Sequence, residues 1–155
     1  MIKTKRILKR NKLIKDLFDN YKKIICYNDA KIPCKIRISN NSHIGGRFYI
    51  TYNPYTNNLK GSININPYII RKIRIKKGYG INSYYKNRGE KIDKYILGNY
   101  KKALRFVILH EFGHLNYYNK YGRKGSKKSL VRKELYADNF ALRYLNKDIK
   151  SWKTI

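Results

Sequence analysis

The feature that most constrains the fold is an almost continuously apolar segment, FVILHEFGHL at residues 106–115. Its side chains leave almost no polar side, so as a helix it would be buried in the core rather than lie on the surface. Yet it carries His110, Glu111 and His114. Burying such groups without partners costs several kcal/mol. The chain must therefore supply partners for three titratable groups inside its own core.

The spacing of these three residues predicts a metal site. Residues four apart lie on the same face of a helix, so His110 and His114 project side by side, with Glu111 next to them. A Zn²⁺ ion bound by two neutral imidazoles offsets the cost of burial directly. The alternative is a helix whose His and Glu only cap or pair locally. We expect one Zn²⁺ per chain, with His110 and His114 as ligands and Glu111 as the general base.

A second predicted helix, residues 129–145, supplies carboxylates. Glu134 and Asp138 lie four apart on one of its faces. Catalytic zinc sites use three protein ligands and a water, so we expect Glu134 to be the third ligand. Asp138 is placed to accept the other ring N–H of one ligating His. Gly113 and Ala137 are small where the two helices would have to approach. The alternative for both acids is an ordinary solvated face, which so acid-poor a chain disfavours.

The two motifs together carry a resemblance to known families. HEFGH at 110–114 followed by ELYAD at 134–138 resembles the gluzincin type of zinc metallopeptidase, in which HExxH and a later Glu bind the metal. The continuation to residue 145 is similar to the second motif of the compact ImmA/IrrE-type metallopeptidases. Residues 46–67 resemble the two strands that precede the active helix there and in SprT-like proteases, although the third His of the SprT-like pattern is absent. The resemblance implies a small zincin-like domain.

We expect an α+β fold in a single domain spanning residues 1–155. Residues 5–26 predict a basic amphipathic helix, which either packs its apolar stripe on the core or lies on a membrane or DNA. Alternating residues predict an antiparallel sheet of about three strands, at 34–39, 47–52 and 62–65. The HExxH active-site helix and the second ligand-bearing helix follow.

The resemblance also implies how a substrate is held. In zinc peptidases of this type an edge strand near the active helix receives the substrate as an added strand. The candidate substrate-binding strand consists of Gly61, Ser62, Ile63, Asn64, Ile65 and Asn66. The alternative is a central strand paired on both sides. For the group that stabilises the oxyanion, the sequence does not distinguish among Tyr117, Tyr118, Tyr121 and Tyr136.

The charge balance is strongly basic, with 37 Lys and Arg against 9 Asp and Glu, a net charge of +28. This charge suits attraction to nucleic acid, to an acidic membrane surface or to an acidic protein substrate, and equally a merely solvated basic surface. Two cysteines, Cys26 and Cys34, make no disulfide framework. No segment has the length and apolarity of a signal peptide or a transmembrane span. We expect a cytoplasmic protein, or a virion-internal one if the source is a phage or virus.

These patterns predict a zinc-dependent endopeptidase that hydrolyses peptide bonds of an intracellular protein. By resemblance to the ImmA/IrrE type, that protein is a repressor or another nucleic-acid-associated protein. The competing hypothesis is a basic nucleic-acid-binding protein with a structural or vestigial zinc site.

Overall fold

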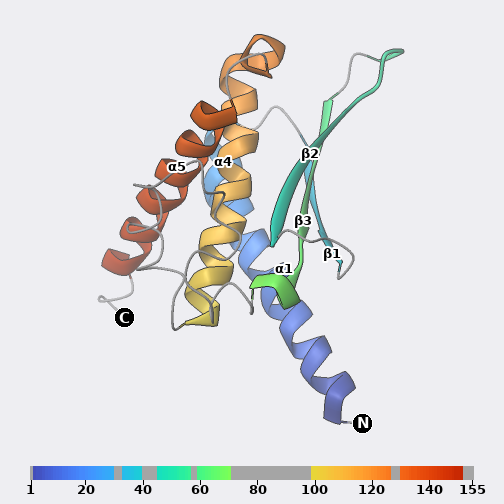
Figure 1. Cartoon of the computed structure of the whole chain (residues 1–155), viewed down its shortest axis with the longest axis vertical. Helices are drawn as coiled ribbons and strands as arrows, with labels where there is room; N and C mark the ends of the chain where they lie inside the picture. Colours follow the sequence, from blue (N-terminus) through green and yellow to red (C-terminus); the bar gives the residue numbers. More distant parts are fainter. Residues whose placement is uncertain are drawn as a thin grey trace.

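The computed structural model describes residues 2–29, 33–39, 45–56, 59–70, 99–126 and 130–151. Along the chain these form α1 (Ile2–Asp29), β1 (Cys34–Ile38), β2 (Gly46–Tyr52), β3 (Leu59–Ile65), α4 (Tyr100–Ser126) and α5 (Leu130–Ser151), as Figure 1 shows. The predicted α+β class, with an N-terminal helix, a three-stranded sheet and two further helices, is confirmed.

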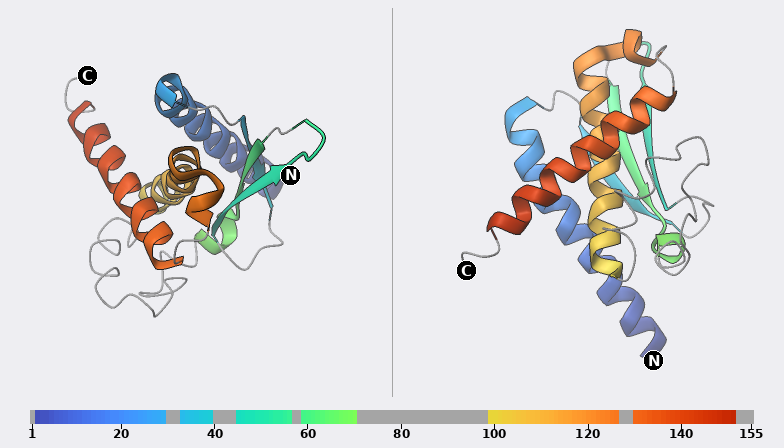
Figure 2. Two further views of the ribbon diagram at one scale, coloured as in Figure 1. Left: turned by 90° about the horizontal axis from the view of Figure 1, so that it is seen from above. Right: turned by 60° about the vertical axis from the view of Figure 1, so that its left-hand side comes forward.

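Helix α4 is the centre of the arrangement. The sheet and α1 pack on one side of it and α5 packs on the other (Figure 2). Its side chains in the buried hydrophobic core cluster are Ala103, Leu104, Phe106, Ile108, Leu109, Phe112 and Leu115. Burying a large apolar side chain stabilises a fold by about 1.5–3 kcal/mol. The segment predicted to be a core helix is therefore the core helix.

Helix α1 packs its apolar stripe on the core. This was one of the two predicted alternatives; the other was a helix that lies on a membrane or on DNA. Phe18 stacks on Phe112 of α4 with ring centroids 5.2 Å apart, and Ile14, Leu17, Tyr21 and Ile25 are also buried. Leu8 and Ile24 are also apolar residues of the predicted helix 5–26, but they are exposed. The first turns of α1 extend past the end of the sheet (Figure 1), which explains why Leu8 lies outside the core.

The sheet has the order β1-β3-β2. β2 pairs with β3 in antiparallel fashion, but β1 pairs with β3 in parallel, so the predicted all-antiparallel sheet is wrong. β2 and β3 follow each other closely in the chain and are neighbours in the sheet. β1 pairs with the other edge of β3, opposite β2. This order puts β3, whose Ile63 and Ile65 are fully buried, in the centre. β1, which has two cationic residues among its five, and β2 take the outer positions, where exposed backbone and charge are tolerated.

This order corrects the predicted substrate strand. Residues 61–66 were expected to form an edge strand, but residues 61–65 of β3 pair with β1 on one side and with β2 on the other. Their backbone groups are already used in two ladders, so they have no edge to offer to a substrate. Among the described residues, the free edge nearest α4 belongs to β2.

The chain reverses direction between the two long helices. Gly122 has φ 57° and ψ −153°, a left-handed backbone conformation that glycine adopts without strain. It interrupts the segment Tyr100–Ser126, and α5 then runs back along α4 (Figure 1). Of the described helices, none is both long enough and apolar enough to span a membrane.

Candidate metal centre

The contact between α4 and α5 depends on two small residues. A Cβ built on Gly113 would lie 2.6 Å from Ala137 Cα and 3.0 Å from its carbonyl oxygen. Both separations are shorter than van der Waals contact, so only glycine fits at this position of α4. The close approach expected from Gly113 and Ala137 is confirmed, and it brings the first turns of α5 within reach of the imidazoles on α4.

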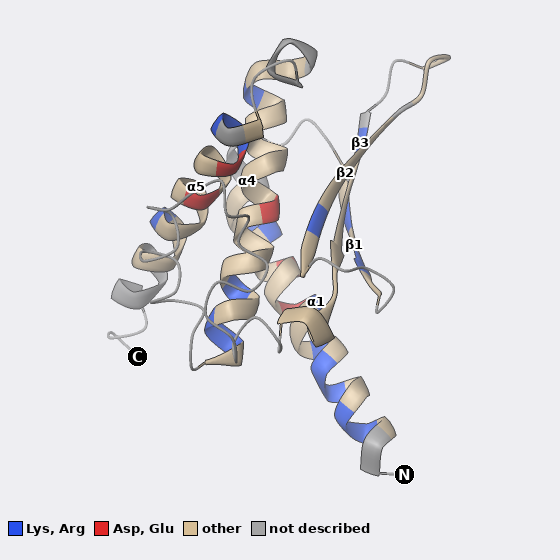
Figure 3. Ribbon diagram, viewed as in Figure 1, with Lys and Arg blue, Asp and Glu red and all other residues tan. Residues whose placement is uncertain are grey.

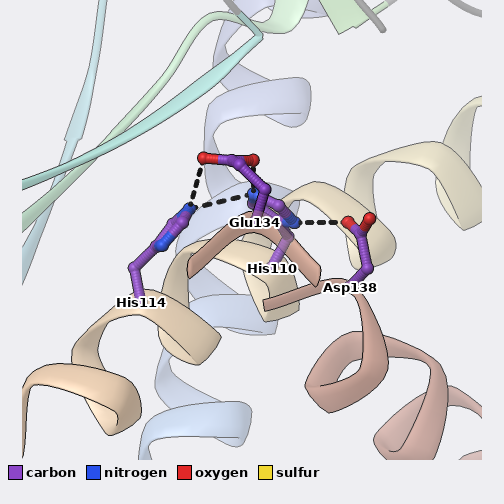
Figure 4. Close-up of polar contacts among 4 residues, drawn as sticks. All are labelled: His110, His114, Glu134 and Asp138. Carbon is purple, nitrogen blue, oxygen red and sulfur yellow. Dashed lines mark hydrogen bonds and ion pairs between the residues drawn. The ribbon is translucent and has the colours of Figure 1, made fainter. Parts of the chain in front are cut away.

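The three predicted ligands converge at this contact (Figure 4). His110 Nε2 lies 3.0 Å from His114 Nε2. Glu134 reaches over from α5, with Oε2 at 3.2 Å from His110 Nε2 and Oε1 at 3.4 Å from His114 Nε2. Within the described part of the chain, these residues are the one group of His, Cys, Asp and Glu that could hold a metal ion.

The separations of the donor atoms fit a tetrahedral ion. With metal–ligand bonds of about 2.0–2.1 Å, tetrahedral geometry places neighbouring ligand atoms about 3.3 Å apart. The three separations between donor atoms run from 3.0 to 3.4 Å. A ligand set of two imidazoles and one carboxylate is typical of catalytic zinc, and leaves a fourth position for water or substrate. The residues present therefore fit a zinc ion.

Asp138 holds His110 from the other side. Its Oδ1 lies 2.8 Å from His110 Nδ1, and both residues are buried (Figure 4). An Nδ1–H that donates to this carboxylate leaves the lone pair of Nε2 directed at the cluster, which is the tautomer a metal ligand requires. The structure places Asp138 where the sequence predicted a carboxylate to hold an imidazole.

Electrostatics at the cluster favour a cation. Burial on its own lowers the pKa of His110, but hydrogen bonds with Asp138 and Glu134 outweigh it and raise that pKa to about 10. Burial likewise raises the pKa of Glu134, but hydrogen bonds with both imidazoles hold it well below its ordinary value of 4.5. Without metal, a proton on His110 therefore supplies positive charge at the place where a metal ion would sit.

Glu111 lies beside the cluster without being part of the ligand group. It is buried, with 4% of its surface exposed. Burial raises the pKa of its carboxyl above 4.5, while the charges of His110 and His114 and a hydrogen bond from the Phe48 backbone act in the opposite direction. A buried carboxyl with a raised pKa, next to a candidate metal site, suits a general base.

Strand β2 contributes two residues to the surroundings of Glu111 that the sequence did not predict. One is Phe48, whose backbone N–H donates to the Glu111 carboxylate. The other is Gly46, where a Cβ would lie 2.7 Å from Glu111 Oε1 and 2.5 Å from Val107 Cγ1. The adjacent glycines at 45 and 46 were the available signal, because paired glycines in a strand often mark a close approach of the backbone to another element.

The tyrosines near the site form a packed cluster between α4 and α5. The ring centroids of Tyr117 and Tyr136 are 5.1 Å apart, and Tyr121 contacts both rings. The Tyr136 hydroxyl donates to Asn116 Oδ1 at 2.5 Å, and burial raises the pKa of Tyr136. Three of the four tyrosines considered as oxyanion stabilisers therefore pack against one another. None of these contacts identifies one of them as the stabiliser.

The protein is thus an α+β protein in which α4 and α5, the helices that follow the sheet, form a candidate metal centre. Residues 71–153 match the family model of Peptidase U49, and this stretch contains both α4 and α5. The chain belongs to the peptidase U49 family, and it is a peptidase. No curated protein and no solved structure matches it.

Proposed function

We propose that this peptidase is a zinc-dependent endopeptidase of the gluzincin type, with His110, His114 and Glu134 holding one Zn²⁺. The observation that carries the proposal is the convergence of three donor atoms at 3.0–3.4 Å. A shared proton satisfies one pair of such atoms at a time, whereas one tetrahedral ion satisfies all three. The order HExxH followed by Glu on a later helix supports the gluzincin type.

Glu111 is the proposed general base. It takes a proton from the attacking water and passes it to the nitrogen of the leaving amine. Its burial beside the imidazoles keeps the carboxyl close to the reacting atoms and excludes bulk water. When bound, the zinc ion polarises the scissile carbonyl and lowers the pKa of a water to about 7.

Asp138 acts through His110 as a positioning residue. By accepting the Nδ1–H it fixes the ring orientation, and its negative charge makes Nε2 a stronger donor to the metal. With Glu111, Glu134 and Asp138, the site gathers three of the nine acidic residues of the chain. Together they favour binding of a divalent cation in an otherwise basic protein.

The substrate strand is proposed to be β2 instead of β3. Asn66 N–H donates to Gly45 O at 2.8 Å, so this pair is hydrogen-bonded. Because bonded and non-bonded pairs alternate along an antiparallel ladder, Phe48, which faces Ile63, directs its N–H away from β3. This direction agrees with the bond that Phe48 donates to Glu111.

A substrate segment added to the free edge of β2 would pair with Phe48. The substrate backbone would compete with Glu111 for the Phe48 N–H. When the substrate pairs with β2, the Glu111 carboxylate would lose this hydrogen bond and become available beside the scissile bond. By the resemblance to the ImmA/IrrE type, the proposed substrate is an intracellular protein, such as a repressor or another nucleic-acid-associated protein.

The test is metal analysis of the purified full-length protein and of its Glu134→Ala form, with cleavage of a denatured protein substrate measured in parallel. The expected result is about one zinc per wild-type chain, loss of zinc in Glu134→Ala, and cleavage that a chelator abolishes and added zinc restores. Equal zinc content in the two proteins would remove Glu134 from the ligand set. Cleavage that is indifferent to chelation would overturn the zinc mechanism and leave only a peptidase.

A further inference from the structure

The sheet has one face that α4 does not cover. Side chains alternate between its two faces, and Gly61, Ile63 and Ile65 of β3 point toward the core. The opposite side chains point to solvent. We call this the outer sheet face and define it by Lys35, Arg37, Arg47, Tyr49, Lys60 and Asn64.

The outer sheet face carries charge of one sign. Four of its six residues are Lys or Arg, all of them exposed, and the three strands contain no Asp or Glu (Figure 3). The strand register places Asn64 between Arg37 on β1 and Arg47 on β2. With neighbouring strands about 4.8 Å apart, the two guanidinium groups extend from backbones about 10 Å apart, on either side of a short amide.

An aromatic ring lies within this basic face. Tyr49 is 40% exposed, and the Arg47 guanidinium carbon lies 5.3 Å from the centre of its ring. Ser62, opposite Tyr49 in the register, donates from its hydroxyl to Asn64 Oδ1 at 3.3 Å. The face therefore combines cations, a partly open ring and short polar groups in neighbouring rows.

We propose that the outer sheet face binds single-stranded nucleic acid, with phosphates at Lys35, Arg37 and Arg47 and a base stacked on Tyr49. Sheets with exposed aromatic residues bind unpaired bases by stacking, and cations beside them hold the backbone. An acidic peptide would use the same cations but has no need of Tyr49.

The shape of the sheet favours a single strand over a duplex. Reading a duplex requires an element that enters a groove, such as a helix or a two-stranded ribbon. The part of the sheet that could enter a groove is the turn between β2 and β3, and its described residues 53–56, NPYT, include no Lys or Arg. The cations lie instead along the strands.

The position of this face separates it from the metal centre. The inner face of the sheet packs on α4, and the ligands lie at the contact of α4 with α5. Nucleic acid on the outer face would leave the metal centre accessible. The peptidase could then act on a protein held by the same nucleic acid.

The test is fluorescence anisotropy with the full-length protein and a labelled oligo(dT) of about 20 nucleotides, beside a duplex of equal length, over about 50–200 mM salt. The sheet variant is Lys35→Gln, Arg37→Gln, Arg47→Gln. The matched control removes the same three charges from exposed positions of α1, Lys5→Gln, Lys9→Gln, Lys12→Gln. Circular dichroism checks that each variant is folded.

We expect the sheet variant to bind oligo(dT) at least about tenfold more weakly, with the slope of log K against log salt reduced by about two. The α1 control should lose less than about threefold. Tyr49→Ala should weaken single-strand binding about 5- to 150-fold, since that is the range for stacking one base, and Tyr49→Phe should restore it.

Three outcomes would overturn the proposal. Equal losses in the sheet variant and the α1 control would mean that the affinity comes from total charge. Duplex binding as tight as single-strand binding would exclude a stacking surface. Unchanged binding in Tyr49→Ala, with polyglutamate competing as well as oligo(dT), would point to an acidic protein partner. None of these outcomes bears on zinc content or on cleavage, so they leave the proposed metallopeptidase function untouched.

Discussion

Charged groups are arranged in opposite ways in two regions, the contact between α4 and α5 and the outer sheet face. Inside, Glu134 and Asp138 lie 2.8–3.4 Å from imidazole nitrogens. Outside, Lys35, Arg37 and Arg47 are exposed on strands that have no acidic residue (Figure 3). Buried charges must be paired because desolvation is expensive, whereas exposed charges are tolerated because water screens them.

The difference indicates what each region is able to bind. The buried cluster has more carboxylates than cationic groups, so it favours an added cation and excludes anions. The outer sheet face has only cationic groups, so it favours an anion. A single chain of net charge +28 can hold both sites because the helix α4 and the inner side of the sheet separate them. The predictions below test this separation.

The largest expected effect is on catalysis at the buried cluster. Glu111→Gln should reduce peptide cleavage about 10²- to 10⁴-fold, the usual contribution of a general acid–base residue, while zinc content stays at the wild-type level. The matched control is Asp16→Asn, which makes the same acid-to-amide change on an exposed position of α1. Cleavage assays and elemental analysis on the same samples check both statements. Loss of zinc in Glu111→Gln would mean that this carboxylate is needed to hold the metal.

A smaller effect is expected when the positioning residue is changed. Asp138→Asn should weaken zinc binding about 10- to 100-fold, because the amide cannot fix the ring of His110 or strengthen Nε2 as a donor. Competition with a zinc chelator of known affinity measures the change. The loss should be in metal affinity first, so that cleavage recovers at high zinc. A defect that saturating zinc does not repair would assign Asp138 a different role.

Both predictions above concern residues of the metal cluster, and the positions of these residues could be predicted well from the sequence. The four-residue spacings of His110 with His114 and of Glu134 with Asp138 are local, so helical periodicity alone places each pair on one face. The approach of the two helices was also predictable, because Gly113 and Ala137 are the small residues at which backbones can meet. Short-range regularity therefore predicts this cluster.

The sheet was less predictable because strand order depends on long-range pairing. Alternation identified three strands and their two faces, but the same alternation is compatible with β3 at an edge or in the centre. Gly46 and Phe48 were missed for the same reason. Their role depends on β2 passing over Glu111, and a distant backbone contact of this kind leaves no periodic signal.

A further prediction concerns pH and the buried proton. In the metal-free protein the pKa of His110 is raised from 6.5 to about 10, so zinc must displace a proton at neutral pH. Zinc affinity should rise about tenfold per pH unit between pH 7 and 9, with about one proton released per zinc. Calorimetry in buffers of different ionisation enthalpy measures the release. Binding that is independent of pH would show that His110 is already neutral without metal.

The same shifts set the stability of the metal-free protein. A raised His110 pKa gives stability that is complete below pH 6.5 and is lost as pH rises through about 10. The lowered pKa of Glu134 gives stability that is present above pH 4.5 and is lost as pH falls below it. The two contributions are complete together between pH 4.5 and 6.5. The Tm gained on adding zinc should therefore grow as pH rises from 6.5 toward 10.

The smallest expected effect is that of Arg37→Gln on stability, and its sign, which should be opposite to that of Asp138→Asn, tests the comparison most directly. Arg37→Gln removes one of several like charges from the outer sheet face, so it should raise the free energy of unfolding by a few tenths of a kcal/mol, the usual scale for exposed positions. Asp138→Asn removes one half of a buried pair and should lower it by about 3–5 kcal/mol in the metal-free protein. Urea unfolding of both variants at about 50 and 500 mM salt measures the two changes, and salt should erase only the first. If Arg37→Gln destabilises the protein as well, Arg37 has a structural partner, and the outer sheet face is not the uncompensated surface on which nucleic acid is proposed to bind.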